Sequence, residues 1–462
     1  MPDAPEPTET IALLRKTFEE GVTRPLAWRK EQLHALRALV SENEDDLLAA
    51  LASDLGKPPV EGLVSDLAFV GSGVDEALKG LDSWTRPERV RVPPAQQPAR
   101  ASIVRDPLGV VAVISPWNYP VHLLLAPMAA AISAGNCVIG KPSELAPATS
   151  ATLARLVPRY LDTTTVAIVE GGVAETQALL AQRLDHIFFT GSTRVGRLVM
   201  EAAAKHLTPV TLELGGKSPT LVDADADLEV TARRIAWGKY LNAGQSCVAP
   251  DYVLVARGVQ DRLITELASA IRRFYGPDPE LSADYARIVN DHHFGRLGVL
   301  LAGSASQVVI GGQADRDTRY MAPTVLNDVR PDAPVMEEEI FGPILAVLGV
   351  ADMDEAAAFV RARPSPLALY VFTQSSETAD RVLAQTASGG ACVNTTLVHL
   401  AVPELPFGGV GASGMGSYHG RHGFETFSHQ RAVLRKPTRP ELGVVYPPHN
   451  KAKAWVLRKA LK

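Results

Sequence analysis

Short β-branched runs alternate with helical segments from residue 110 onward, and this alternation most constrains the fold. Residues 110–114 and 137–139 predict buried strands, and residues 123–132 between them predict a helix. Such alternation is typical of a parallel sheet with crossover helices. Further strands are predicted at 166–169, 186–189, 219–222, 252–255, 307–310, 344–348 and 369–372, and a further helix at 149–161. We therefore expect a sheet that binds ligands at the carboxyl ends of its strands.

The chain is too long for one ordinary core. Its 462 residues predict two or three domains, and 46% hydrophobic and 21% charged residues are ordinary for a globular protein. We expect two α/β lobes with a boundary near Gly215-Gly216. Residues 31–55 predict a helix that Gly56 and Pro58 stop, and residues 89–105 predict a two-stranded arm around Pro93-Pro94.

Charge and apolar patterning exclude several classes of partner. The formal net charge is −5, with no domain-wide basic excess, so we expect no nucleic-acid partner. The first six residues lack the basic flank and apolar core of a signal peptide. The most apolar window, 121–140, contains His122, Pro127, Ser133 and Asn136, which favours a buried helix and strand over a membrane span.

Cysteine usage favours a reducing cytoplasm. The chain has three widely spaced cysteines, Cys137, Cys247 and Cys392, so neither a disulfide framework nor a zinc site is expected, and we predict no metal. Cys247 follows a glycine turn, and a lone thiol in this position is a candidate nucleophile. Taken alone, a cysteine is more often a small buried apolar residue. We interpret Cys137 and Cys392 as small buried apolar residues of this kind.

Two polar residues at the ends of strands have alternative interpretations. Glu213 lies between two leucines, where a raised pKa would suit a general base, but alternation along a strand would equally turn it to water. Asn118 lies in a loop between Pro116 and Pro120. Its amide either donates to a developing oxyanion or forms a hydrogen bond with the backbone of its own turn.

Two other strand ends are candidates for nucleotide contacts. The segment Gly191-Ser192-Thr193-Arg194-Val195-Gly196 follows a predicted strand, and N–H groups at such a helix start suit a phosphate. Its spacing is neither the usual dinucleotide fingerprint nor a P-loop, so an ordinary strand-to-helix turn explains it as well. Lys141 and Glu144 either hold ribose hydroxyls or form a surface turn.

These motifs, in this order, resemble the aldehyde dehydrogenase superfamily over essentially the whole chain. The resemblance is closest to the class 3 branch, which includes fatty, aromatic and coniferyl aldehyde dehydrogenases. It rests on Ala236-Trp237-Gly238-Lys239-Tyr240 before Cys247, Ala249-Pro250-Asp251-Tyr252 after it, Glu339-Ile340-Phe341-Gly342-Pro343, the glycine-rich stretch 405–420, Phe424 and Phe427-Ser428-His429.

The resemblance implies a catalytic role for three residues. Cys247 would attack the aldehyde carbon as a thiolate and give a thiohemiacetal oxyanion. The Asn118 amide and the backbone N–H of Cys247 would stabilise that oxygen. Hydride transfer to nicotinamide would leave a thioester, and Glu213 would activate the water that hydrolyses it.

The resemblance also implies a cofactor site and a substrate channel. Lys141 and Glu144 match adenine-ribose contacts, Gly191 to Gly196 the pyrophosphate turn, and Glu339 and Phe341 the nicotinamide contacts. Trp117 is also expected among the residues that bind the cofactor. Glu144 would repel a 2′-phosphate, which favours NAD, although this branch often accepts NADP too. Channel residues are expected at Tyr119, Leu241, Thr395, His399 and Phe407.

The implied fold is aldehyde dehydrogenase-like, with two parallel-sheet α/β lobes and a small β-arm. A Rossmann-like NAD(P)-binding domain is expected at 1–85 and 106–213, and a catalytic domain at 214–425. Residues 86–105 and 426–446 would form the arm of a homodimer. The basic tail 447–462 is too short to span a membrane. A frayed or dimer-packed terminus is favoured over surface attachment to a membrane.

The resulting hypothesis is NAD(P)-dependent oxidation of a medium- to long-chain aliphatic or aromatic aldehyde to its acid. One alternative is a CoA-acylating relative, which typically lacks the carboxylate at the position of Glu213. Another is a catalytically retired binding or structural protein on the same fold. That protein would be expected to have lost Cys247, Glu213 or Asn118, and this chain retains all three.

Overall fold

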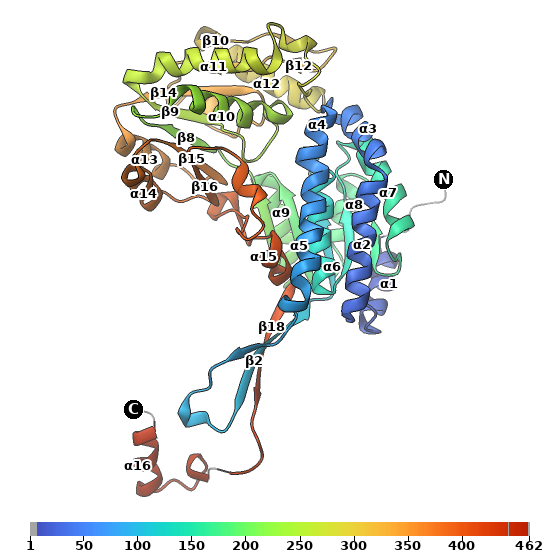
Figure 1. Cartoon of the computed structure of the whole chain (residues 1–462). Helices are drawn as coiled ribbons and strands as arrows, with labels where there is room; N and C mark the ends of the chain where they lie inside the picture. The colour runs from blue at the N-terminus through green and yellow to red at the C-terminus, as the bar shows by residue number, and fades with distance from the viewer. Residues whose placement is uncertain (1–6, 442, 461–462) are drawn as a thin grey trace.

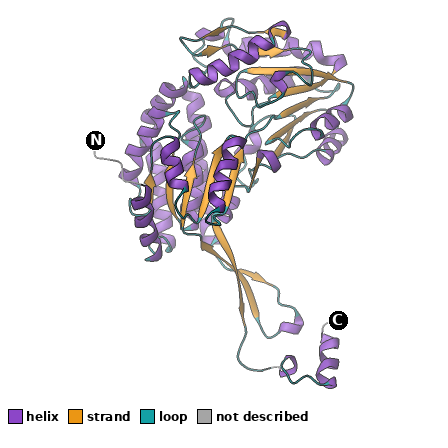
Figure 2. Cartoon of the chain, turned by 180° about the vertical axis from the view of Figure 1, so that it is seen from behind, coloured by secondary structure: helices purple, strands orange, loops and turns teal. Residues whose placement is uncertain are grey.

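The computed structural model describes residues 7–441 and 443–460, and it shows two α/β lobes with a long arm below them (Figure 1). The first six residues, where no signal peptide is expected, lie outside the described residues, as do Leu461 and Lys462 of the basic tail. Each lobe is a sheet covered by helices, which is clearest from behind (Figure 2).

The first lobe is built on a six-stranded sheet in the order β17-β7-β6-β3-β4-β5. All neighbouring pairs are parallel except β17 with β7. The strands are β3 (Val110–Ile114), β4 (Cys137–Lys141), β5 (Val166–Ile168), β6 (His186–Gly191), β7 (Val210–Leu214) and β17 (Gly414–Met415). The strands predicted between 110 and 189 are confirmed.

Both faces of this sheet are buried, as the continuous apolar runs require. On β3, Val110, Ala112 and Ile114 pack with one group of helices, and Val111 and Val113 pack with another. The first group is α1 (Pro7–Glu19), α8 (Val173–Leu180) and α9 (Thr193–Ala204). The second group is α2 (Leu26–Glu42), α5 (Ala68–Trp84), α6 (His122–Ala134) and α7 (Pro147–Tyr160).

The second lobe has a seven-stranded sheet in the order β10-β13-β14-β9-β8-β15-β16, parallel except at β10. The chain passes from one sheet to the other between β7 and β8, across Gly215-Gly216. The strands are β8 (Pro219–Val222), β9 (Tyr252–Ala256), β10 (Val308–Ile310), β13 (Thr324–Leu326), β14 (Ile344–Val350), β15 (Ala368–Phe372) and β16 (Gly390–Val393). The helices are α10 (Leu228–Tyr240), α11 (Gln260–Tyr275), α12 (Asp291–Gly303), α13 (Met353–Arg361) and α14 (Ser376–Gln385), and a small hairpin joins β11 (Ala314–Asp315) to β12 (Tyr320–Met321).

Two helices replace the single helix predicted at 31–55. The chain breaks at Asn43 between α2 and α3 (Glu44–Leu55), and Gly56 ends α3 in the left-handed conformation with φ 58°. Next come α4 (Pro59–Gly62) and a π-helical turn, η1 (Leu63–Leu67), which runs into α5. Turns of this kind often mark functional sites.

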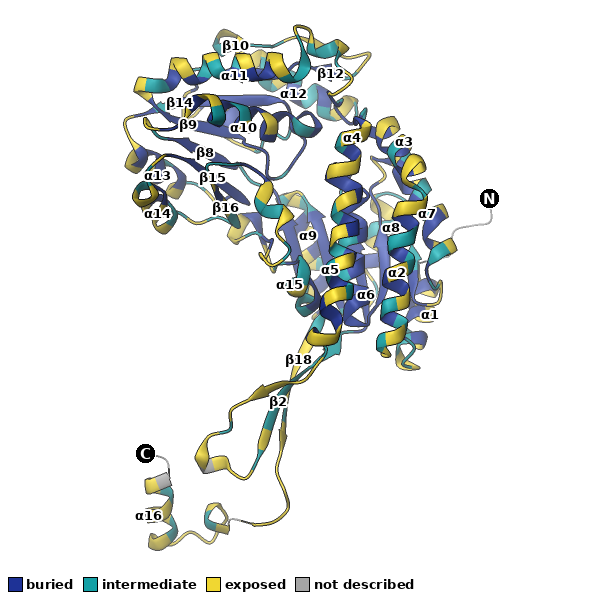
Figure 3. Cartoon of the chain, viewed as in Figure 1, coloured by how far each residue is buried: buried dark blue, intermediate teal, exposed yellow. Residues whose placement is uncertain are grey.

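The arm is a three-stranded antiparallel sheet of β1 (Glu88–Val90), β2 (Arg100–Pro107) and β18 (Ser428–Arg435). The two predicted strands are confirmed, and the third, β18, lies within residues 426–446, which the resemblance assigned to the arm. Most of the arm is exposed or partly exposed, in contrast to the buried sheets (Figure 3). Helix α15 (Gly420–Thr426) packs on α5 and α6, and α16 (Lys451–Ala460) ends the chain. None of the described helices is long and apolar enough to cross a bilayer.

Candidate active site

An apolar cavity of about 480 Å³ opens beside Cys247. Three of the five predicted channel residues, Tyr119, Leu241 and Phe407, line it. Thr395 and His399 line neither this cavity nor the second one described below, so their place in the channel stays a prediction. Further lining residues come from segments whose sequence carried no signal of a channel, among them Glu61, Phe69, His122, Trp237, Tyr418 and His419.

A left-handed turn carries Cys247 into the cavity. Asn242, Ala243 and Gly244 have φ values of 52°, 50° and 74°. Because left-handed backbone is costly for non-glycine residues, surrounding contacts must hold the turn. The buried Gln245 side chain does so, with Nε2 donating to the carbonyl of Arg287 and Oε1 accepting from the N–H of Val289, both at 2.9 Å.

The thiol of Cys247 lies near two carboxyl groups. Burial raises the pKa of Cys247 most, and Glu339 and Glu213 raise it further by their negative charge. The thiol is therefore neutral at physiological pH in the free protein. Attack on an aldehyde requires that a nearby group first accept its proton.

Asn118 lies against the loop that carries Cys247. It follows β3, is only 2% exposed, and its Nδ2 donates to the carbonyl of Gln245 at 3.1 Å. Its Oδ1 is buried and has no partner among the described residues. The side chain therefore does not satisfy its own turn, and its amide is directed to the nucleophile loop.

Glu213 is buried instead of facing water. It is 2% exposed within β7, and the short strand β17 covers it by pairing Gly414 with Glu213. Both carboxylate oxygens have no hydrogen-bond partner in the described part of the chain. Burial raises the pKa of Glu213 well above its usual value. An unpaired carboxyl group of this kind is suited to accept and return a proton.

Glu339 is the second buried carboxyl group that acts on the thiol of Cys247. Burial raises its pKa to about 8, Asp251 adds to the shift, and the N–H of Gly216, with Lys217, opposes it. A Cβ atom on Gly215 would lie 1.9 Å from Glu339 Oε2, so the carboxyl group fits only against glycine. The buried Oε1 has no partner in the described structure. Nearby, Phe341 meets Trp117 edge to face, with ring centroids 5.3 Å apart.

Lys141 and Glu144 lie at the end of β4. Lys141 is 2% exposed, and its Nζ donates to the carbonyls of Pro142 at 2.7 Å and Gly171 at 2.5 Å. Burial lowers its pKa. Glu144 is 47% exposed and lies 4.0 Å from the ammonium group. A fixed buried cation beside an accessible carboxylate is suited to ribose hydroxyls.

The predicted phosphate turn joins β6 to α9. Ser192 caps α9, with Oγ accepting from the N–H of Val195 at 3.4 Å, and Thr193 donates to the carbonyl of Ala412 at 3.1 Å. A Cβ atom on Gly196 would lie 2.6 Å from Leu214, so glycine allows the helix to approach the sheet. The Oγ1 of the neighbouring Thr190 is buried and has no described partner.

The other two cysteines lie outside the cavity lining. Cys137 is a buried core residue of β4. Cys392, on β16, has Sγ 3.2 Å from Nδ1 of His399. Burial raises the pKa of this thiol and lowers that of His399 to about 4, so the pair is uncharged. Cys247 alone of the three faces the cavity.

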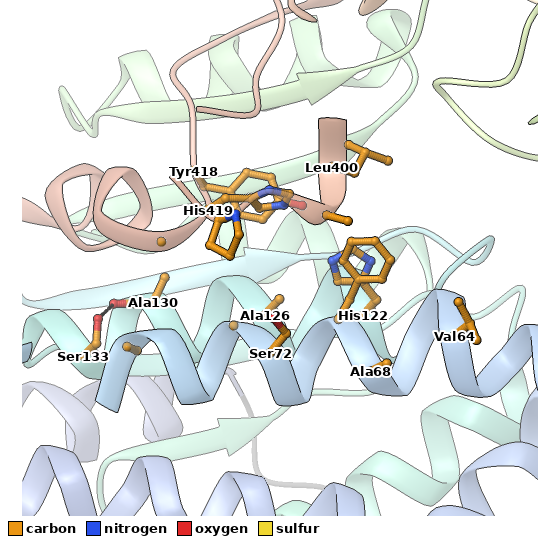
Figure 4. Close-up of a pocket in the computed structure, with 16 residues that line it drawn as sticks. Val64, Ala68, Ser72, His122, Ala126, Ala130, Ser133, Leu400, Tyr418 and His419 are labelled. Atoms are coloured by element: carbon orange, nitrogen blue, oxygen red, sulfur yellow. Dashed lines mark hydrogen bonds between the residues drawn. The ribbon is translucent and has the colours of Figure 1, made fainter. Parts of the chain in front are cut away.

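A second cavity of about 270 Å³ adjoins the first. Both are lined by Phe69, His122, Tyr418 and His419. Beyond this junction the second cavity follows the seam between α5 and α6 under the C-terminal segment (Figure 4). Small side chains line the seam, namely Ala68, Ser72, Gly73 and Ala77 of α5 and Ala126, Ala130 and Ser133 of α6.

Known proteins resemble this chain throughout. The model of the aldehyde dehydrogenase family matches residues 4–433. Human aldehyde dehydrogenase family 3 member B1 is 49% identical over 456 residues, which cover 98% of this chain and 97% of the relative. The dimeric NADP-preferring aldehyde dehydrogenase of Rattus norvegicus is 48% identical over 429 residues, 93% of this chain and 94% of its own. A solved structure, the substrate-bound state of Staphylococcus aureus AldH, is 43% identical with a TM-score of 0.97 and covers 99% of this chain and 100% of its own.

Proposed function

Because the chain belongs to the aldehyde dehydrogenase family and is an NAD(P)-dependent oxidoreductase that acts on aldehydes, we propose roles for its site residues. Cys247 is the nucleophile, Asn118 stabilises the oxyanion, and Glu213 is the general base. One observation carries the assignment: Cys247 lines an apolar cavity while the buried carboxyl groups of Glu213 and Glu339 lie close enough to raise its pKa.

The first step forms a bond between Cys247 Sγ and the aldehyde carbon, and the carbonyl electrons move to oxygen. Asn118 Nδ2 and the backbone N–H of Cys247 donate to that oxyanion. Because Asn118 already lies against the nucleophile loop, only its side-chain amide has to turn from the Gln245 carbonyl to the oxyanion. Removal of one such donor typically costs on the order of 100- to 1,000-fold in rate.

Glu213 handles protons in both halves of the reaction. Its carboxylate form accepts the Cys247 proton before attack and then releases that proton to solvent, which restores the carboxylate for the second half. After oxidation, Glu213 takes a proton from water as that water attacks the thioester carbon, which releases the acid and restores the thiol. The absence of a described partner on either carboxylate oxygen supports this role, because a paired carboxylate would be held ionised and less basic.

Bound NAD(P) supplies the hydride acceptor. Lys141, Glu144, the turn from Gly191 to Gly196, Glu339 and Phe341 would hold it, with Trp117 behind Phe341. The unpartnered buried oxygens of Glu339 and Thr190 support this fit, because both need hydrogen bonds that a ligand can provide. The accessible carboxylate of Glu144 favours NAD over a 2′-phosphate. Because the rat relative is named NADP-preferring, both cofactors require measurement.

We propose that the substrate is a medium- to long-chain aliphatic or aromatic aldehyde. The cavity beside Cys247 is lined mainly by apolar side chains, and the second cavity extends it along α5 and α6. At the junction, burial lowers the pKa of both His122 and His419 to about 3, so both rings are neutral. An uncharged junction is compatible with an alkyl chain.

We further propose a cytoplasmic homodimer assembled through the arm. Val90 and Leu434 of the arm are exposed apolar residues, and the rat relative is named dimeric. All three cysteines are free, as expected in a reducing compartment. In the tail, α16 exposes Trp455 and Val456 among basic residues. Packing against the partner is favoured over contact with a membrane surface, and unchanged liposome binding after truncation at Pro448 would support this.

The experiment measures reduced nicotinamide at 340 nm with aldehydes of increasing chain length and with benzaldehyde, using NAD or NADP, with and without CoA. We expect CoA-independent oxidation by the wild type, none by Cys247→Ala, and near wild-type turnover by Cys392→Ala. A Cys247→Ala variant that turns over normally would refute the assignment of the nucleophile. Strict dependence on CoA would favour the acylating alternative.

A further inference from the structure

A buried ion pair, Lys57–Asp66, lies behind Asn118. We propose that this pair positions Asn118: it holds the backbone of the oxyanion donor so that the side-chain amide faces the reacting carbonyl. The inference rests on the role proposed above for Asn118. Neither residue touches the substrate in this scheme, so both are positioning residues.

The contacts are direct and fully enclosed. Lys57 Nζ lies 2.7 Å from Asp66 Oδ2, and both side chains are 0% exposed. The same ammonium group donates to the backbone carbonyl of Asn118 at 3.0 Å and lies 4.2 Å from the centre of the Tyr119 ring. Asp66 Oδ1 accepts from the N–H of His122 at 3.1 Å. One ion pair thus contacts both ends of the loop from Asn118 to His122.

Local backbone features explain how the pair forms. Lys57 follows Gly56, whose left-handed conformation ends α3 and turns the chain inward. Asp66 lies in the π-helical turn η1, where the altered helical register changes the direction of the side chain. The carboxylate therefore reaches the first N–H group of α6, where a negative charge is also favourable to the helix dipole.

The Asn118 carboxamide depends on this backbone for its orientation. Its Oδ1 has no partner in the described structure, so the side chain is held only by the bond from Nδ2 to Gln245. The Asn118 carbonyl, in contrast, accepts from two donors, Lys57 Nζ and Asn242 Nδ2 at 2.8 Å. When the amide turns from Gln245 to an oxyanion, these two bonds are what keep its Cα in place.

The same segment also holds the nucleophile loop. Glu61 Oε1 accepts from the N–H of Asn242 at 2.8 Å, so residues 57–66 contact the oxyanion donor and the loop of Cys247 together. A buried ion pair is weak evidence for a stabilising role, because a well-packed apolar pair is often as stable. The geometry at Asn118 supplies a catalytic reason for retaining a charged pair here.

The decisive experiment compares Lys57→Met with the double variant Lys57→Met/Asp66→Leu. The single variant leaves Asp66 as an unpaired buried charge, so we expect lower thermal stability and slower hydride transfer. The double variant removes both charges and should regain most of the stability. Its single-turnover burst of reduced nicotinamide should nevertheless stay about 10- to 100-fold slower than in the wild type, because the Asn118 carbonyl lacks its cationic donor.

A wild-type burst in the double variant would overturn the proposal, because stability alone would then explain the pair. If the double variant does not fold, Lys57→Arg replaces it, since it keeps the charge but moves the donor. We expect a slower burst in Lys57→Arg than in the wild type, and an unchanged burst in this variant would also overturn the proposal. Lys30→Met is the matched control. It removes a surface ion pair in which Lys30 Nζ lies 2.8 Å from Asp82 Oδ2, and it should leave the burst unchanged.

A double-mutant cycle tests whether the effect passes through Asn118. In an Asn118→Ala background, the change at Lys57 and Asp66 should slow the burst by less than twofold. An equal slowing in both backgrounds would refute positioning of Asn118. A normal burst in Asn118→Ala alone would instead refute the role proposed for Asn118, so the two failures are distinguishable.

Discussion

Replacing Gly73 by leucine should shorten the aldehydes that the enzyme prefers. Gly73 lies within α5 on the wall of the second cavity, and a Cβ atom there would meet nothing within 4 Å. The leucine side chain would therefore extend into open space without a clash. Because glycine is a poor helix former, the substitution should not lower the thermal stability.

The expected magnitude follows from the groups displaced. Leucine adds four carbon atoms and would exclude about four methylene groups of a bound alkyl chain. Each buried methylene contributes about 0.8 kcal/mol, so the loss is about 3 kcal/mol, or roughly 100-fold in kcat/KM. Hexanal, which should end within the cavity beside Cys247, should lose less than twofold.

The assay is kcat/KM for hexanal, decanal and hexadecanal at fixed NAD. Gly298→Leu is the matched control, because Gly298 is also inside a helix, has no neighbour within 4 Å of a Cβ position, and lines neither cavity. We expect a loss that grows with chain length in Gly73→Leu only. An equal loss for all three aldehydes, or none for hexadecanal, would refute the tail site along α5 and α6.

Three other predictions concern the catalytic residues. Cys247→Ala should abolish aldehyde oxidation, as the absorbance of reduced nicotinamide at 340 nm would show. Glu213→Gln should slow the burst of reduced nicotinamide, because Cys247 loses its proton acceptor, and should slow steady turnover by about 100- to 10,000-fold, with a thioester that acid quenching traps. Because the pKa of Glu339 is raised to about 8, this carboxyl group keeps its proton in the folded protein between pH 4.5 and 8 and loses it in the unfolded chain. The contribution of Glu339 to the free energy of unfolding should therefore fall as pH rises through this window, so that the wild type loses stability relative to Glu339→Gln, as urea denaturation of both proteins at several pH values would show.

Much of the fold was predictable from short-range patterns. Residues 110–114 are continuously apolar because both faces of β3 are covered by helices, and the turn at Gly135 separates α6 from β4. In the arm, the local pattern predicted only the two strands between 89 and 105. The third strand, β18, lies within residues 426–446, which only the family resemblance assigned to the arm, because β18 joins β2 from more than 300 residues away in the sequence. The division of the chain into the domains given above stays a prediction. Strand β17 lies within residues 214–425, the predicted catalytic domain, but it joins the sheet of the first lobe.

The site was predictable as residue types and not as a set of contacts. Glu213 had two equal interpretations until β17 covered it, since alternation along one strand does not say which face is buried. The family resemblance implied that His399 and Thr395 lie near the channel. The observed turn at 397–401 directs the His399 ring to Cys392. Lys57 and Asp66 carried no signal, because a charged pair nine residues apart is usually solvated.

The sequence by itself determined the alternation of strands and helices, the family, and the chemical types needed for attack, proton transfer and nucleotide binding. These depend on local conformational preference and on side-chain chemistry, and both follow from the identity and order of the residues. Only the tertiary structure decided which carboxyl groups are buried, which cysteine faces a cavity, and what holds Asn118. Burial, pKa and hydrogen-bond partners arise from groups far apart in sequence, since Lys57, Asn118 and Asn242 meet only when the lobes are folded.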